Sequence, residues 1–245
     1  MSNRVVALTD RRELEPRNRL LAVLPGRDLL SLRPHLEPVL LPRGVLLEAD
    51  EPLTRVYFVE TGVVSIVTVL ESRTSAGVAM VGREGLIGIA TLLGGDTALG
   101  RHTVQVPGSA LALEVDRFRS ALRASPKLRA ACQAYAQAFL LQVLHAAACN
   151  RVHTMEQRCA RWLLTCADRT EDDTFQLTQE NLADLLGVRR STVTVIAHRL
   201  RHAALICYRR GAITVLDRRG LEAVACECYR VVRDRCGRLL ARAFG

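Results

Sequence analysis

A basic, hydroxyl-rich group of residues in the C-terminal third of the chain could bind a polyanion. Its members follow one another closely: Arg189, Arg190, Ser191, Thr192 and Thr194. Arginine can pair with guanine through two hydrogen bonds, and hydroxyl side chains bind phosphate oxygens. Residues 189–219 contain eight arginines and a single acidic residue, Asp217. We therefore expect this segment to contact nucleic acid.

Two short helices joined by a glycine turn would position these side chains. Thr178 is a suitable N-cap for the first helix, whose apolar stripe is Leu182, Leu185 and Leu186. Gly187 ends that helix because glycine adopts the left-handed conformation without steric cost. A second helix opens at residues 191–192, with the apolar stripe Val193, Ile196, Ala197 and Leu200. This pattern predicts a helix-turn-helix, whose second helix presents its N-terminal residues to base edges.

A basic hairpin is predicted directly after the second helix. Residues 205–208 and 212–216 have the composition of two short strands around Arg209, Arg210 and Gly211. Such a hairpin forms a wing whose tip suits phosphate. The competing interpretation is an ordinary turn between two helices with a solvated basic face.

Residues 177–215 resemble the DNA-binding domain of the Crp/Fnr transcription regulators. The resemblance implies that Gln179 contacts phosphate at the start of the first helix and that Arg190 reads a base. From their place at the start of the second helix, Arg189 and Ser191 are expected to read bases with Arg190. Phosphate contacts are expected at Thr192, Thr194, Arg199, Arg209 and Arg210. Ser191 and Val195 stand where the best-known members carry Glu and a second Arg, so the familiar target sequence is not expected.

Composition bounds the class of protein. The chain has 245 residues, 49% of them apolar, and a net charge of +9. Its pI is about 9.6, which favours a polyanionic partner. Neither a signal peptide nor a membrane-spanning run is recognisable, so we expect a cytoplasmic protein with no membrane partner. The absence of a phosphate loop, a nucleophile elbow or metal-spaced ligands argues against an enzyme.

The segment from residue 39 to residue 115 changes to short apolar and β-branched runs. We expect strands at 39–41, 45–47, 56–59, 63–70, 78–81, 102–106 and 110–115. Regular short strands separated by turn residues predict an antiparallel sandwich or barrel. Residues 40–118 resemble the effector domain of the Crp/Fnr family, a jelly roll of the cyclic-nucleotide-binding type. The resemblance rests on Gly44, Leu46 and Glu48, on residues 57–63 and on residues 85–88.

The resemblance also places an effector pocket. Its residues would be Gly88, Ile89, Arg101, His102, Thr103, Val143 and Leu144. Nucleotide-binding members carry a ribose-binding Glu where this chain has Ile89, and hydroxyl residues near positions 143 and 144. Arg101 is shifted by one residue from the phosphate-binding position, which would turn it to the opposite strand face. Cyclic AMP is therefore disfavoured, and an unidentified small molecule or no effector is expected.

The cysteines give no recognisable metal motif. They occupy positions 132, 149, 159, 166, 207, 226, 228 and 236. The family's iron–sulfur sensors gather cysteines near the N-terminus, where this chain has none, and His102 is the only histidine of the roll that could bind haem. Cys226 and Cys228 are too close for a disulfide on one helix and lack a zinc spacing. No metal or cofactor is therefore predicted, and a thiol redox switch stays open.

Residues 126–153 are predicted to form one long helix with two apolar stripes. The first stripe alternates four and three apart and is Leu128, Cys132, Tyr135, Phe139, Gln142, Ala146 and Cys149. A second stripe beside it is Ala136, Leu140, Val143, Ala147 and Asn150. One side can face the roll and the other a second copy, and we assign the first stripe to the dimer seam. The alternative is a core helix inside a monomer.

The predicted fold class is α+β, with an N-terminal antiparallel β jelly roll, a long dimerisation helix and a C-terminal winged helix-turn-helix. The expected parts are a flexible tail (1–19), an effector domain (20–125), the dimerisation helix (126–153), the DNA-binding domain (154–220) and a helical extension (221–245). The expected function is a homodimeric, sequence-specific regulator that binds double-stranded DNA, with RNA polymerase as a further candidate partner. The alternative is a small-ligand or cyclic-nucleotide receptor whose helix-turn-helix mediates protein contacts.

Overall fold

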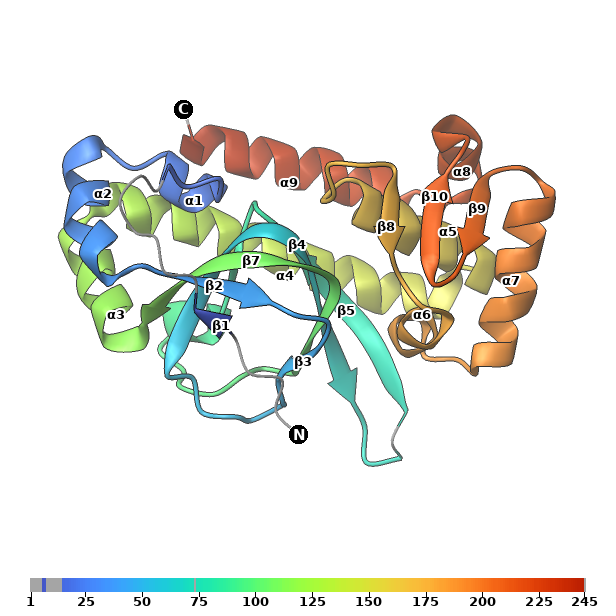
Figure 1. Cartoon of the computed structure of the whole chain (residues 1–245), viewed down its shortest axis with the longest axis horizontal. Helices are drawn as coiled ribbons and strands as arrows, with labels where there is room; N and C mark the ends of the chain where they lie inside the picture. Colours follow the sequence, from blue (N-terminus) through green and yellow to red (C-terminus); the bar gives the residue numbers. More distant parts are fainter. Residues whose placement is uncertain (1–5, 8–14, 73, 245) are drawn as a thin grey trace.

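The computed structural model describes residues 6–7, 15–72 and 74–244. A β roll occupies the N-terminal half, and Figure 1 shows short helices at one end of it and the C-terminal domain at the other. A long helix links the two halves. None of the helices within the described ranges combines the length and the apolar character needed to cross a bilayer.

The roll is built from antiparallel strands in the path β1-β2-β7-β4-β5, with β3 paired to β7 and β6 paired to β4. The strands are β1 Val6–Ala7, β2 Glu37–Leu41, β3 Gly44–Leu47, β4 Arg55–Val69, β5 Ser75–Val81, β6 Leu86–Ile87 and β7 Arg101–Glu114. The helices of this half are α1 Arg19–Ala22, α2 Gly26–Leu32, α3 Val115–Ala124 and the 3-10 helices η1 Arg33–His35 and η2 Ile89–Leu93. The antiparallel character predicted from the sequence is confirmed.

Two pairs of predicted strands are single long strands in the structure. β4 unites the expected strands 56–59 and 63–70, and β7 unites 102–106 and 110–115. Gly62 (φ 85°) lies in β4, and a Cβ there would come within 2.6 Å of the Val106 carbonyl oxygen. Gly108 makes the reciprocal approach from β7. Glycine thus acts here as a bend with register shifts and not as a strand end.

The segment expected to be a loose tail packs against the roll where the structure describes it. Val6 and Ala7 pair with Leu40 and Val39. Asn18 is buried and donates hydrogen bonds to the carbonyl oxygens of Val59 (2.9 Å) and Gly85 (2.8 Å). Residues 1–5 and 8–14 of the expected tail lie outside the described residues.

The long helix is α4, Pro126–Val152, and it begins at the N-cap Ser125. It ends at His153, and a capping box formed by Thr154 and Gln157 starts α5, Met155–Ala167. The remaining elements are β8 Thr174–Gln176, α6 Gln179–Leu186, α7 Arg190–His202, β9 Ile206–Arg209, β10 Ala212–Val215, α8 Arg218–Val224 and α9 Cys228–Phe244. A long helix followed by the predicted C-terminal domain is therefore confirmed.

The C-terminal extension differs from the prediction of one helix. It forms α8 and α9, which are separated by residues 225–227. The break lets α9 turn back and run along α4, as Figure 1 shows. Leu240 of α9 is buried in the core of the roll, whereas Tyr229 at the other end of α9 is buried in the core of the C-terminal domain. The extension therefore joins both halves.

The two halves also contact each other directly. Val63, Val67 and Met80 of the roll belong to the same buried cluster as Trp162. A Cβ on Gly77 of β5 would come within 2.9 Å of Leu185 on α6. Even one added methyl group would crowd this contact, so β5 rests immediately on the first helix of the helix-turn-helix.

Candidate DNA-binding surface and effector domain

The helix-turn-helix forms from the local signals expected of it. Thr178 caps α6 and accepts a hydrogen bond from the Asn181 backbone N–H at 3.2 Å. Gly187 ends α6 in the left-handed conformation (φ 69°). The buried stripes of α6 and α7 meet in one cluster that includes Leu182, Val193 and Ile196. This packing fixes α7 as the second helix and turns its polar side outward.

The wing is a two-residue hairpin. β9 and β10 pair with Arg209 opposite Ala212, so Arg210 and Gly211 form the turn. Both turn residues have positive φ (49° and 79°), the combination that a type I′ turn requires. Arg209 and Arg210 are exposed, and β8 adds a third strand beside β10. The hairpin therefore has the basic tip that was predicted.

One face of α7 is exposed in the described chain. Its exposed members alternate at helical spacing: Arg190, Ser191, Thr194, Val195 and His198. No acidic residue lies in the first turn of α7, so the positive end of the helix dipole and the exposed Arg189 both favour an anion. Val195 is 53% exposed, which suits contact with a thymine methyl group.

Sequence reasoning missed His198. It follows Thr194 by four residues and Arg190 by eight, so helical spacing alone could have placed it on this face. Its ring Nε2 lies 2.8 Å from the Arg201 guanidinium. His198 therefore extends the exposed polar row toward the C-terminal part of α7.

Three of the residues expected at phosphate have side-chain partners inside the chain, and they are Gln179, Thr194 and Arg199. Thr194 donates to the Gln179 side-chain oxygen at 2.9 Å, which ties the starts of the two helices together. Arg199 lies 3.7 Å from Glu156 of α5. Thr192 is half-buried and shares a surface hollow with Glu156 and Arg199. Thr192 and Arg199 thus border α5, to one side of the row that begins at Arg190.

The effector-domain residues have dissimilar surroundings. Gly88 (φ 95°) precedes η2, and Ile89 is buried in the hydrophobic core. Arg101 forms a 2.8 Å ion pair with Glu48 at the surface, and Thr103 is half-buried in β7. An arginine already paired with a carboxylate is a poor anchor for a nucleotide phosphate.

The remaining residues of the expected effector pocket also do not share one environment. His102 is buried and its Nδ1–H donates to the Gly100 carbonyl at 2.9 Å. Burial lowers the pKa of His102 to about 4, so the ring is neutral at pH 7. Val143 packs against the core of the roll, whereas Leu144 is 60% exposed on the other side of α4.

Comparison with known protein families now bears on both halves. Residues 39–125 match the cyclic nucleotide-binding domain, and residues 157–224 match the Crp-like helix-turn-helix domain. Together these matches cover more than half of the chain. The chain belongs to the Crp/Fnr superfamily.

Solved structures show the same fold. The c-di-GMP responsive global regulator CLP of Xanthomonas campestris is 16% identical, with a TM-score of 0.64, over 79% of this chain and 100% of that one. FixK2 from Bradyrhizobium japonicum is 17% identical, with a TM-score of 0.67, over 78% and 98%. A CRP/FNR-family regulator from Thermus thermophilus is 22% identical, with a TM-score of 0.60, over 77% and 98%. A comparison with curated protein sequences found no match.

The structure revises the dimer seam that was expected on α4. The side chains assigned to it are buried within the single chain: Leu128, Cys132, Tyr135, Phe139, Gln142, Ala146 and Cys149. Tyr135 donates to the Leu86 carbonyl at 3.2 Å, and Gln142 accepts from the Met80 backbone at 3.4 Å. The roll and α9 cover this stripe, so it is not available to a second copy.

A different stripe of α4 is exposed. Its members again alternate four and three apart: Gln133, Gln137, Leu140, Leu144, Ala147 and Arg151. Leu140 and Leu144 are 57% and 60% exposed, although both are large apolar side chains. We call this set the exposed α4 stripe. Periodicity alone could not tell it from the buried stripe, because the positions of the roll and α9 decide which side is covered.

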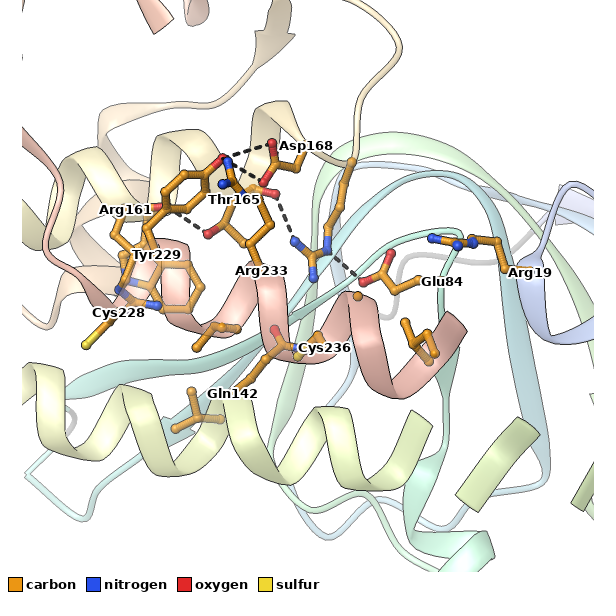
Figure 2. Close-up of a pocket in the computed structure, with 16 residues that line it drawn as sticks. Arg19, Glu84, Gln142, Arg161, Thr165, Asp168, Cys228, Tyr229, Arg233 and Cys236 are labelled. Carbon is orange, nitrogen blue, oxygen red and sulfur yellow. Dashed lines mark hydrogen bonds and ion pairs between the residues drawn. The ribbon is translucent and has the colours of Figure 1, made fainter. Parts of the chain in front are cut away.

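A cavity of about 250 Å³ lies where α9 meets α4 and α5. Figure 2 shows Tyr229 directed at Asp168, and Glu84 among the residues that line the cavity. Arg169 Nε lies 2.8 Å from Glu84, and the Tyr229 hydroxyl donates to Asp168 at 3.0 Å. Burial, followed by the nearby Asp168 charge, raises the pKa of Tyr229 to about 12. The Tyr229 contact joins the start of α9 to the C-terminal end of α5, and the Glu84–Arg169 pair joins the segment after α5 to the roll.

All eight cysteines are free thiols, but they fall into distinct environments. Burial raises the pKa of Cys132, Cys159 and Cys166 to about 12, so these three remain protonated fillers of the core. Cys149, by contrast, receives a hydrogen bond from Cys226 that lowers its pKa. Sequence reasoning treated Cys226 and Cys228 as two positions of one helix, whereas the break after α8 places Cys226 outside α9.

Proposed function

We propose that the protein is a homodimeric transcription regulator that binds double-stranded DNA sequence-specifically. The observation that carries the proposal is the uncovered face of α7, with Arg190 at its start and Arg209 and Arg210 on the neighbouring wing. A protruding helix end with arginine and no acid suits the electronegative major groove.

The two groups of arginines would have different tasks. Arg190, assisted by Arg189 and Ser191, would read base edges, because a guanidinium can pair with both acceptors of guanine. Gln179, Thr194, Arg209 and Arg210 would hold phosphates and fix the register of the helix. Thr192 and Arg199 would contribute at the edge beside α5, and Arg199 would have to exchange its Glu156 partner for phosphate.

The second copy would pair along the exposed α4 stripe. Two leucines that are each more than half exposed support this choice, because burying them removes apolar area from water. Two-fold pairing would place the two copies of α7 in successive major grooves, roughly 34 Å apart. RNA polymerase remains a further candidate partner, and the cytoplasm is the compartment where such a regulator would act.

The effector is proposed not to be cyclic AMP. Buried Ile89 occupies the position of the ribose-binding carboxylate, Arg101 is paired with Glu48, and Leu144 offers no hydrogen bond to a base. Each feature removes one contact that a cyclic nucleotide would need.

The direct test is binding of the effector-free protein to fluorescent random-sequence duplex DNA by anisotropy, as a function of salt. A regulator contacting six to ten phosphates should lose roughly 10³-fold or more in affinity between about 50 and 200 mM salt. Calorimetry with cyclic nucleotides in the absence of DNA is the companion measurement. A protein that bound a cyclic nucleotide but no DNA at low salt would instead be a receptor whose helix-turn-helix contacts protein.

A further inference from the structure

Four potential metal ligands meet where α4 ends and α9 begins. We call them the thiol–histidine cluster, and its members are Cys149, His153, Cys226 and Cys228. One ligand atom from each residue lies within 4.8 Å of all the others. Three of the four residues are buried and His153 is partly buried. Residues distant in the sequence thus present three thiols and one imidazole to a single point.

The separations within the cluster fit one tetrahedral ion. Cys149 Sγ lies 3.5 Å from Cys226 Sγ, and Cys228 Sγ lies 3.7 Å from His153 Nδ1. With Zn–S bonds near 2.3 Å and Zn–N bonds near 2.0 Å, neighbouring ligands of a tetrahedral zinc lie about 3.5–3.8 Å apart. An iron–sulfur cube spreads its thiolates over several iron ions, so it would need wider spacing.

The histidine is oriented as a metal ligand would be. Its Nε2 lies 3.0 Å from the Glu227 carboxylate, while Nδ1 faces Cys228. A Glu227 partner fixes the proton on Nε2 and leaves the Nδ1 lone pair for an ion. Hydrogen bonding of the distal ring nitrogen to a carboxylate is the usual support of metal-bound histidine.

Buried positive charge beside the cluster is a second, independent observation. Arg161 is 6% exposed, and within the described structure its Nε and one terminal nitrogen have no hydrogen-bond partner. Its charge acts on Cys149, Cys226 and Cys228, and Figure 2 shows Arg161 and Cys228 at the same end of the cavity. A buried cation without a counter-charge is costly. Three thiolates around a divalent ion carry a net charge of −1 and would supply the counter-charge for Arg161.

We propose that the thiol–histidine cluster binds one zinc ion in a closed, structural, tetrahedral site. The three thiols would release their protons to solvent on binding, and neutral His153 would coordinate through Nδ1. All four positions would be filled by protein, so no water or substrate would reach the ion.

Zinc would join the C-terminal extension to the end of α4, at the junction of the two halves. Cys149 lies in the last turn of α4 and Cys226 lies 77 residues later, before α9. Beside the cluster, Arg158 of α5 donates to the Leu186 carbonyl at 2.7 Å, where the first helix of the helix-turn-helix ends. One ion would thereby tie α4 and α9 together next to the elements that carry the DNA-binding surface.

The test uses the full chain purified under reducing conditions, with metals measured by mass spectrometry. We expect about one zinc per chain. After removal of zinc by a chelator, cobalt(II) should bind with the same stoichiometry. It should give intense visible bands of a tetrahedral ion and near-ultraviolet thiolate charge-transfer bands. Zinc should then displace the cobalt. This titration requires no variant, so it does not depend on whether a mutant folds.

Matched variants locate the site. Cys228→Ser should lose stoichiometric zinc, whereas Cys236→Ser, a half-buried thiol elsewhere on α9, should retain it. Glu227→Gln should weaken zinc affinity by roughly 10- to 100-fold while leaving the cobalt bands in place. That result would identify Glu227 as a positioning residue.

Several results would overturn the proposal. One is a reduced wild-type protein that contains no zinc and takes up no cobalt. A second is stoichiometric iron together with sulfide. A third is metal-free protein that, isolated without reductant, carries a Cys149–Cys226 disulfide and still fails to bind cobalt after reduction. Zinc retained unchanged in Cys228→Ser would equally refute it.

Discussion

Replacing Leu144 with aspartate should dissociate the dimer while leaving each chain folded. Leu144 is 60% exposed in the single chain, so the roll and α9 do not depend on it. Burying this fraction of a leucine, which contributes about 1.5–3 kcal/mol when fully buried, is worth roughly 1–2 kcal/mol per copy. Both copies carry the change, so Leu144→Asp should weaken dimerisation by roughly 2–4 kcal/mol, about 30- to 700-fold in Kd.

Sedimentation equilibrium over a wide range of protein concentrations measures this shift. Leu30→Asp is the matched control, because Leu30 is 63% exposed on α2 and lies outside the exposed α4 stripe. Circular dichroism and thermal melting establish that both variants fold. A Leu144→Asp protein that dimerises as tightly as wild type and Leu30→Asp would refute the assignment of this stripe to the interface.

Three further outcomes follow from the described contacts. Arg190→Ala should relax the sequence preference at one base pair by roughly 1–3 kcal/mol, measured by competition with single-base operator variants. An equal loss of affinity for specific and random DNA would rule out base reading by Arg190. Arg209→Ala should weaken binding to all DNA sequences alike, and it should reduce the slope of log affinity against log salt concentration by about one unit per chain. An unchanged slope in anisotropy titrations would show that the wing tip does not contact DNA. His102 has a folded pKa of about 4, below its unfolded value, so the unfolded chain binds the extra proton as pH falls. The contribution of His102 to the free energy of unfolding should be complete above about pH 6.5 and should diminish by about 3 kcal/mol toward pH 4. In urea unfolding, His102→Gln should therefore be less pH-dependent than wild type over that window, and parallel curves would contradict the buried neutral ring.

Local signals explain what the sequence could predict. Thr178, Gly187 and the leucine stripe between them specify the start, end and buried side of α6 within a few residues of chain. The same holds for the wing, where Arg210 and Gly211 form a two-residue turn between short strands. Such features depend on neighbours that the sequence places side by side.

Long-range packing explains the features that the sequence could not predict. Both stripes of α4 have helical spacing, and only packing against the roll and α9 decides that Cys132 is covered and Leu144 is not. The long strands β4 and β7 likewise depend on a close approach of Gly62 and Gly108 across the sheet. In each case the deciding neighbour is dozens of residues away.

The thiol–histidine cluster is the strongest example of this limit. Cys226 and Cys228 have no recognised metal spacing by themselves, and a single predicted helix over both would direct them apart. The break between α8 and α9 brings them to Cys149 and His153 at the end of α4. Sequence reasoning therefore predicted no metal site where the structure brings four potential ligands together.

Selection of bound sequences from random duplex DNA, with purified effector-free protein, tests the central claim most directly. The account predicts enrichment of a partly palindromic site whose half-sites are centred about one helical turn, roughly 34 Å, apart. Arg190→Ala should relax the preference at one position of each half-site, and Leu144→Asp should strongly weaken the enrichment. Recovery of no sequence above random background, with and without added small-molecule cell extract, would contradict a DNA-reading homodimer.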